Sequence, residues 1–229
     1  MIKKHIPNTI TLANLTCGCI GIIACTRGDL AMASYMIWLA AIFDFFDGFV
    51  ARLLKISSPI GKELDSLADM VTFGVLPAFI LFSLQENISA GFLPYISISV
   101  ALFSALRLAK FNIDTNQSHG FIGMPTPATA FFVSGLAFWP TDSMFISSST
   151  SIIIISLSLS LLMVAPFPML ALKFKDYSLR NNISRYFVVM VSVVLIIVFG
   201  KISFPIIISF YVLLSLFVAL MDKRKQQYN

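Results

Sequence analysis

Four aspartates stand close together in a chain that is otherwise strongly apolar: Asp44, Asp47, Asp65 and Asp69. A carboxylate at the centre of a membrane helix costs roughly 2.5–3.5 kcal/mol on insertion scales, so something must neutralise these groups. Their segment contains no histidine or cysteine, the ligands that favour zinc. Because oxygen-only ligands select hard cations such as Mg²⁺, Mn²⁺ or Ca²⁺, we expect the aspartates to bind divalent metal.

The same carboxylates indicate a type of reaction. Two divalent ions about 3.5–4 Å apart stabilise the attacking and leaving oxygens in displacement at phosphorus, and four carboxylates suit such a pair. Arg52 would place a fixed positive charge against phosphate oxygens, and Ser58 offers a hydroxyl nearby. The pattern predicts transfer chemistry on a pyrophosphate-containing substrate, with two Mg²⁺ or Mn²⁺ ions in each site.

Two helices must position these residues. At about 100° per residue, one stripe of the first helix collects two acids and two small residues that leave room for a bulky group: Asp44, Asp47, Gly48 and Ala51. On the second helix, Gly61, Asp65 and Asp69 follow one face at intervals of four residues. A short antiparallel hairpin would turn the two faces toward each other and place the four carboxylates around one cavity.

The composition places this hairpin in a membrane. Hydrophobic residues make up 58% of the 229 residues and charged residues only 12%, against about 25% charged in soluble domains. Because lipid cannot satisfy free backbone groups, the spans must be helices. We expect one all-α, polytopic membrane helix bundle over residues 1–229. Its eight spans are predicted at 7–26, 31–54, 61–84, 93–112, 124–140, 151–173, 185–200 and 203–221.

The basic residues predict the orientation of the bundle. With these spans, fourteen lysines and arginines fall on one side, and only Arg27 and Lys201 fall on the other. Cytoplasmic loops carry an excess of such residues. Both termini and the acidic hairpin are therefore predicted on the cytoplasmic side of the cell inner membrane. The fourteen are Lys3, Lys4, Arg52, Lys55, Lys62, Arg107, Lys110, Lys173, Lys175, Arg180, Arg185, Lys223, Arg224 and Lys225.

The acidic segment matches D-x2-D-G-x2-A-R-x8-G-x3-D-x3-D at every fixed position. It thereby resembles the CDP-alcohol phosphotransferase family. The resemblance implies a membrane enzyme, usually a homodimer, that displaces CMP from a CDP-alcohol with the hydroxyl of a second alcohol. It also implies a core of six helices, here about residues 6–173 with the signature hairpin at 44–69, followed by accessory helices at about 185–221.

The resemblance assigns roles to single residues. The four aspartates bind the metals, and Asp69 acts as general base. The positions that bind the CDP-diacylglycerol donor are Gly48, Ala51, Arg52, Ser58, Gly61 and Asp65. Family resemblance favours direct displacement, without a covalent enzyme intermediate.

Two further segments resemble the phosphatidylserine synthase branch of this family: Arg107-Leu-Ala-Lys-Phe-Asn112 and Phe121-Ile-Gly-Met-Pro-Thr-Pro-Ala128. That branch transfers the phosphatidyl group of CDP-diacylglycerol to L-serine in phospholipid biosynthesis. Arg107 and Lys110 would receive the serine carboxylate, and Pro125 and Thr126 would belong to the same acceptor pocket. Anchoring at the membrane surface by the basic residues, and stiffening of the next span by the prolines, would explain the same residues.

Two alternatives remain open. A sister transferase would use the same donor with another acceptor, such as glycerol 3-phosphate in a phosphatidylglycerophosphate synthase, or an inositol phosphate. A cation transporter would use the aspartates as an ion path. The acids cluster near one interface and not along the spans, which favours an enzyme. Membrane lipid and a second copy of the chain are expected partners, and nucleic acid is not.

Overall fold

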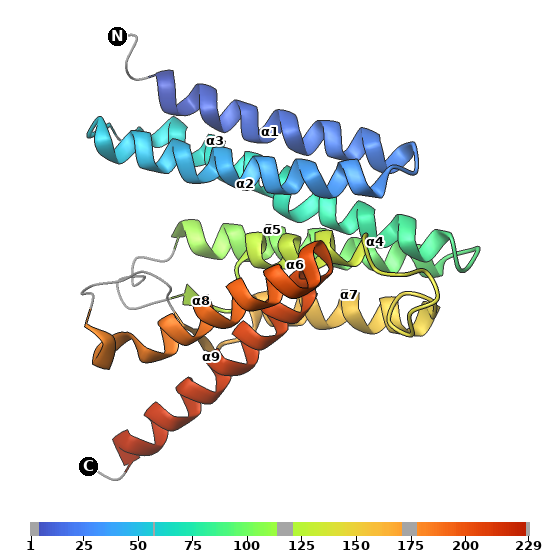
Figure 1. Ribbon diagram of the computed structural model, residues 1–229. Helices are drawn as coiled ribbons and strands as arrows, with labels where there is room; N and C mark the ends of the chain where they lie inside the picture. Colours follow the sequence, from blue (N-terminus) through green and yellow to red (C-terminus); the bar gives the residue numbers. More distant parts are fainter. Residues whose placement is uncertain (1–4, 57, 114–120, 171–177, 228–229) are drawn as a thin grey trace.

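The described part of the chain is a bundle of antiparallel helices with two very short strands (Figure 1). The computed structural model describes residues 5–56, 58–113, 121–170 and 178–227. The predicted all-α class is confirmed. The elements are α1 (His5–Thr26), α2 (Leu30–Leu53), α3 (Pro59–Asp69), η2 (Met70–Val75), α4 (Leu76–Glu86), η3 (Leu93–Ile98), α5 (Ser99–Ile113), β1 (Phe121–Ile122), α6 (Thr126–Leu136), α7 (Ser149–Val164), β2 (Pro168–Met169), α8 (Leu179–Phe199), η5 (Gly200–Ser203) and α9 (Phe204–Gln227).

Helix α1 packs along α2 and also against α3 and η2. Glycines on α1 allow this approach. A Cβ at Gly18 would lie 2.5 Å from Thr72 Oγ1, and a Cβ at Gly21 would lie 2.4 Å from Leu76 Cδ2. Small residues let helix backbones come close together in membrane bundles. The first helix is therefore held against both arms of the acidic hairpin.

The predicted span 61–84 is one continuous helical rod, but it is not uniformly α-helical. Ser58 caps its beginning, where Ser58 Oγ accepts a hydrogen bond from the Gly61 backbone N–H at 3.0 Å, and Pro59 follows at the first helical position. Immediately after Asp69, residues Met70–Val75 form the π-helix η2. Such π segments within α-helices occur frequently at functional sites.

The predicted limits of two spans are wrong. The span predicted at 124–140 contains α6, which ends at Leu136, and the span predicted at 151–173 overlaps α7, which runs from Ser149 to Val164. Hydropathy alone continues the second span too far, because Pro166 and Pro168 cannot continue a helix. Residues 171–173 lie outside the described part of the chain.

The chain after α7 instead forms an antiparallel pair with the segment before α6. Strand β1 pairs with β2 through Phe121↔Met169 and Ile122↔Pro168. Gly123 makes a tight turn at φ +74°, where a Cβ would lie only 2.4 Å from Met163 O. The pairing fixes the start of α6, and with it Pro125 and Thr126, against the end of α7.

The C-terminal helices α8 and α9 form a hairpin, and α9 packs on α6 (Figure 1). The turn between α8 and α9 contacts the C-terminal part of α6 and the residues that follow it. Trp139 Nε1 donates a hydrogen bond to Ile202 O at 3.0 Å, and a Cβ at Gly135 would lie 2.3 Å from Pro205 Cδ. Residues 185–200 and 203–221, predicted as spans, lie within this hairpin.

The protein is a polytopic helical membrane protein. Among the described residues, four helical stretches are long and apolar enough to cross a membrane: His5–Thr26, Pro59–Glu86, Leu93–Ile113 and Asn182–Met221. The last stretch contains the α8–α9 hairpin, and α7 is an apolar but shorter helix. The count of eight crossings stays a prediction.

One end of the bundle carries the N-terminal end of α1, the α2–α3 connection and the C-terminal end of α5 (Figure 1). Arg52, Lys62 and Lys110 belong to these segments, whereas Arg27 lies in the α1–α2 turn at the opposite end. The basic residues at these described positions thus follow the predicted segregation. Lys3, Lys4, Lys173 and Lys175 lie outside the described residues, as do the side chains of Arg180, Lys223, Arg224 and Lys225.

Candidate active site

Three aspartates converge between α2 and α3. One carboxylate oxygen from each of Asp44, Asp47 and Asp65 lies within 4.8 Å of the corresponding oxygens of the other two. Asp47 is buried, and the other two are half-buried. Three converging carboxylates with no nitrogen or sulfur ligand fit a hard divalent cation, because its charge offsets their mutual repulsion. This acidic cluster can bind a metal ion.

Asp69 lies one helical turn beyond Asp65 on α3, outside this group of three. It nevertheless interacts electrostatically with the three other carboxylates, and most strongly with Asp44. The structure therefore brings all four predicted aspartates into one acidic region. Within that region, Asp69 has two neighbours from other helices, Asn14 of α1 and Arg107 of α5.

Helix α1 holds two of the aspartates. Thr11 Oγ1 donates a hydrogen bond to Asp47 Oδ2 at 2.7 Å, and Asn14 Nδ2 donates one to Asp69 Oδ1 at 3.3 Å. Thr11 and Asn14 are both buried, and Asn14 is 0% exposed. Their spacing of three residues puts them on one face of α1, next to each other. Each arm of the hairpin thus has its own anchor on the first helix.

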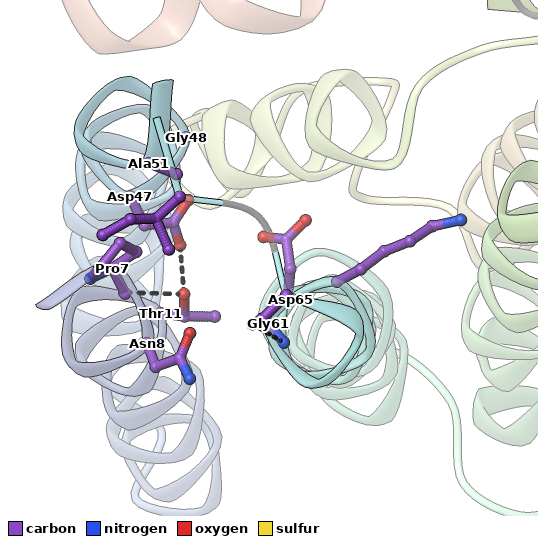
Figure 2. Close-up of a pocket in the computed structure, with 11 residues that line it drawn as sticks. Pro7, Asn8, Thr11, Asp47, Gly48, Ala51, Gly61 and Asp65 are labelled. Atoms are coloured by element: carbon purple, nitrogen blue, oxygen red, sulfur yellow. Dashed lines mark hydrogen bonds between the residues drawn. The ribbon is translucent and has the colours of Figure 1, made fainter. Parts of the chain in front are cut away.

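A cavity of about 260 Å³ opens beside the acidic cluster (Figure 2). Residues of α1 and α2 lie on one side of it, and Gly61 and Asp65 of α3 lie on the other (Figure 2). Its lining combines acidic, amide and hydroxyl groups with small residues that expose backbone. The lining residues are Pro7, Asn8, Thr11, Asp47, Gly48, Ala51, Ile56, Ser58, Gly61, Lys62 and Asp65.

The two predicted glycines lie in this cavity for different reasons. A Cβ at Gly61 would lie 2.9 Å from Ser58 Oγ and 3.2 Å from Asn8 Oδ1, so a larger residue there would displace the Ser58 hydroxyl that caps α3. A Cβ at Gly48 would meet nothing closer than Arg52 Nη1, at 3.7 Å. The folded protein therefore tolerates a larger residue at position 48, and the open space there is available to a ligand.

The remaining predicted donor-binding residues surround the same space. Ala51 and Ser58 line the cavity, and the Ser58 hydroxyl also caps α3. Arg52 is exposed, with its guanidinium beside Gly48 at the edge of the cavity. A flexible cation at the rim and a hydroxyl inside are suited to phosphate oxygens.

The predicted acceptor residues separate into two groups. Arg107 is buried, with 9% of its surface exposed, and interacts electrostatically with Asp69. Arg107 Nη1 donates a hydrogen bond to Thr126 Oγ1 at 3.4 Å, and Thr126 is buried at the start of α6. Lys110, by contrast, is exposed, and Pro125 is half-buried at the position before α6. The structure brings Arg107, Thr126 and Asp69 together and leaves Lys110 on the surface.

Helix α5, which carries Arg107, is tied to α3 near its C-terminal end. Lys62 Nζ donates a hydrogen bond to Asn112 O at 3.0 Å, and Asn112 Nδ2 donates one to Ser66 Oγ at 2.9 Å. These bonds hold the basic helix against the helix of Asp65 and Asp69. They also explain why the segment Arg107–Asn112 belongs to the same site as the acidic hairpin.

Sequence reasoning missed the contribution of α1. Asn8, Thr11 and Asn14 recur at intervals of three residues in an otherwise apolar helix, and that periodicity was a signal of one polar face. Nothing in the sequence indicates which aspartate each residue contacts, because that depends on how α1 packs across the hairpin.

Comparison with known proteins supplies the context. The sequence profile of the CDP-alcohol phosphatidyltransferase family matches residues 4–175. Over 139 residues, the chain is 39% identical to a CDP-diacylglycerol–serine O-phosphatidyltransferase of Bacillus subtilis, with 59% of this chain and 76% of the relative covered. Relatives of the same name in Helicobacter pylori (strain J99) and Saccharomyces cerevisiae are each 38% identical, over 129 and 158 residues. These matches cover 56% and 60% of this chain but only 54% and 55% of the relatives, so the chain spans about half the length of those two proteins.

Proposed function

Because this chain belongs to the CDP-alcohol phosphatidyltransferase family, we propose that it transfers the phosphatidyl group of CDP-diacylglycerol to the hydroxyl of L-serine and releases CMP. The observation that carries the proposal is the convergence of three aspartates beside a cavity with open space at Gly48. Support for serine as the acceptor comes from the names of the relatives and from a buried cation, Arg107, beside Asp69.

The donor occupies the cavity between α1, α2 and α3. Gly48, Ala51 and Gly61 allow the CDP part to approach the backbone, while Arg52 and Ser58 contact phosphate oxygens. The acyl chains remain in lipid, beside the exposed apolar residues of α2. Phe45, Phe46 and Phe49 lie on that outer face, 61%, 47% and 45% exposed.

Asp44, Asp47, Asp65 and Asp69 hold the divalent cations, and the oxygen-only set suits two Mg²⁺ or Mn²⁺ ions. When bound, such ions withdraw charge from phosphorus and stabilise the leaving phosphate. Thr11 keeps Asp47 oriented through its hydrogen bond of 2.7 Å. Supporting groups of this kind commonly tune metal sites.

Asp69 is the general base. It accepts the proton of the serine hydroxyl as the serine oxygen forms a bond to the phosphorus attached to diacylglycerol. The bond from that phosphorus to the CMP phosphate oxygen breaks, and CMP leaves with the electron pair. Arg107 receives the serine carboxylate in a charge-assisted hydrogen bond, and Thr126 orients the guanidinium. Lys110 and Pro125 complete the mouth of this acceptor pocket.

The proposal includes the setting of the enzyme. It works as a homodimer in the cell inner membrane, with both termini and the active site on the cytoplasmic side. The basic residues at the same end of the bundle as the acidic hairpin support this orientation, since cytoplasmic segments are enriched in lysine and arginine.

One assay tests the function. Purified protein receives CDP-diacylglycerol and Mg²⁺ or Mn²⁺, together with L-serine, glycerol 3-phosphate or an inositol phosphate in turn, and CMP release is measured. We expect CMP release with serine, and none after the metal is removed with a chelator. CMP release with glycerol 3-phosphate but not with serine would reject the acceptor. Ion flux in liposomes, without CMP release for any acceptor, would instead favour a transporter.

A further inference from the structure

Only one of the two polar groups of the Asn14 side-chain amide has a hydrogen-bond partner. Its Nδ2 donates to Asp69, but Asn14 Oδ1 is buried and has no hydrogen-bond partner among the described residues. Leaving a buried acceptor unpaired is costly, and a leucine would fill this position in an apolar helix without that cost. The unpaired oxygen therefore indicates that a hydrogen-bond donor binds beside Asp69 during function.

A complementary group is present near the same aspartate. Arg107 interacts electrostatically with Asp69, and Arg107 Nε is also buried without a hydrogen-bond partner in the described part of the chain. Asp69 thus has one neighbour with an unpaired acceptor and another with an unpaired, positively charged donor. Both neighbours are at least nine-tenths buried, so bulk water does not satisfy them.

A zwitterionic amino acid matches this arrangement. Its ammonium group supplies the donor that Asn14 Oδ1 lacks, and its carboxylate supplies the acceptor that Arg107 Nε lacks. The hydroxyl of the side chain then faces Asp69, the base. An acceptor without an ammonium group leaves Asn14 unpaired, and one without a carboxylate leaves Arg107 unpaired. Sites built to hydrogen-bond a substrate group reject analogues that lack it.

We propose that Asn14 determines acceptor specificity by receiving the ammonium group of the acceptor amino acid on its Oδ1, while its Nδ2 orients Asp69. This inference rests on the proposed function and adds a recognition group that the family signature does not contain. It also explains why Asn14 is an amide: a single side chain must donate to a carboxylate and accept from an ammonium group.

Inhibition by unreactive analogues tests recognition of the ammonium separately from the reactivity of the acceptor. L-Alanine carries the ammonium and carboxylate of serine but no hydroxyl, and propionate lacks the ammonium as well. Both are measured as inhibitors of CMP release with L-serine. In the unaltered protein we expect L-alanine to inhibit at a concentration at least about tenfold lower than propionate, as one charge-assisted hydrogen bond predicts. Equal inhibition constants, or inhibition by neither compound, would reject recognition of the ammonium.

Asn14→Leu is the informative variant, and Asn14→Ala replaces it if the leucine variant does not fold. We expect the preference for L-alanine, the ratio of the inhibition constant of propionate to that of L-alanine, to fall to about one. Thr11→Val is the matched control, because Thr11 lies on the same face of α1 but contacts Asp47. It should slow CMP release and leave the preference intact.

Three results would overturn the assignment. If the Asn14 variants keep the preference and only lower kcat, Asn14 acts solely by orienting Asp69. If they keep it and raise the Mg²⁺ concentration for half-maximal rate tenfold, Asn14 acts on the metal site and not on the acceptor. If Thr11→Val also abolishes the preference, the effect is not specific to Asn14. Absence of serine-dependent CMP release in the unaltered protein would instead refute the proposed function itself.

Discussion

Gly48→Ala separates the stability of the protein from its activity. Gly48 lies within α2, where replacing glycine by alanine in a helix typically stabilises by about 0.5–1 kcal/mol. The added methyl would meet only the Arg52 guanidinium, at 3.7 and 4.0 Å, which is ordinary contact. We therefore expect the variant to unfold at the same temperature as the unaltered protein or higher.

Activity should move in the opposite direction. The methyl projects into the cavity that we assign to the CDP part of the donor. Forcing an extra methyl into a filled site costs about 1–3 kcal/mol, which corresponds to roughly a 5- to 150-fold fall in kcat/KM for CDP-diacylglycerol. The assay is CMP release over a range of donor concentrations, paired with thermal unfolding in the same detergent.

Gly61→Ala is the matched control in the same cavity. Its methyl would lie 2.9 Å from Ser58 Oγ and 3.2 Å from Asn8 Oδ1, so it collides with the protein itself. That variant should lose both activity and stability, the latter by about 0.5–2 kcal/mol if the Ser58 cap is lost. Unaltered kcat/KM in Gly48→Ala would refute the placement of the donor over Gly48. Equal destabilisation of the two variants would refute the packing on which the comparison is based.

Three further predictions concern the aspartates and the C-terminal hairpin. Thr11→Val removes the hydrogen bond to Asp47 and should raise the Mg²⁺ concentration for half-maximal CMP release about 10- to 100-fold, whereas an unchanged requirement would show that Thr11 does not support the metal site. Asp69→Asn should lower turnover at least about 100-fold with thermal stability retained, and near-normal turnover would exclude Asp69 as the base. Trp139→Phe removes the bond to Ile202 O and should lower the free energy of unfolding by about 0.5–1.5 kcal/mol with kcat unchanged, so a large loss of kcat would link the hairpin to catalysis.

The acidic cluster could be predicted from the sequence because it depends on local geometry. Spacings of three and four residues put Asp44 with Asp47, and Asp65 with Asp69, on single helix faces, and a short connection keeps the two helices near each other. Their convergence needed little further information. The end of α7 was also predictable in principle, since Pro166 and Pro168 stand where the helix stops, but a hydropathy pattern gives too little weight to them.

The surroundings of Asp69 could not be predicted in the same way. Arg107 and Lys110 lie three residues apart on α5, and their sequence context is similar, yet one is buried beside the acids and the other is exposed. The difference comes from the packing of α5 against α7 and η2, which buries one face of the helix. The π-helix after Asp69 could not be predicted from the sequence either, because the same apolar residues fit an α-helix and a π-helix.

The first helix connects the two halves of the proposed active site. Thr11 reaches Asp47 on α2 and Asn14 reaches Asp69 on α3, so a single turn of α1 spans from the acidic cluster to the proposed base. The glycines behind that turn, Gly18 and Gly21, bring α1 against η2 and α4 and leave it little freedom to shift. In the proposed mechanism, the distance between the phosphorus and the acceptor hydroxyl would therefore be set by a helix that carries neither an aspartate of the site nor a residue of the family signature. Substitutions that loosen the packing of α1, such as Gly18→Val, should therefore reduce turnover with every acceptor, whereas those at Asn14 should change which acceptor is used.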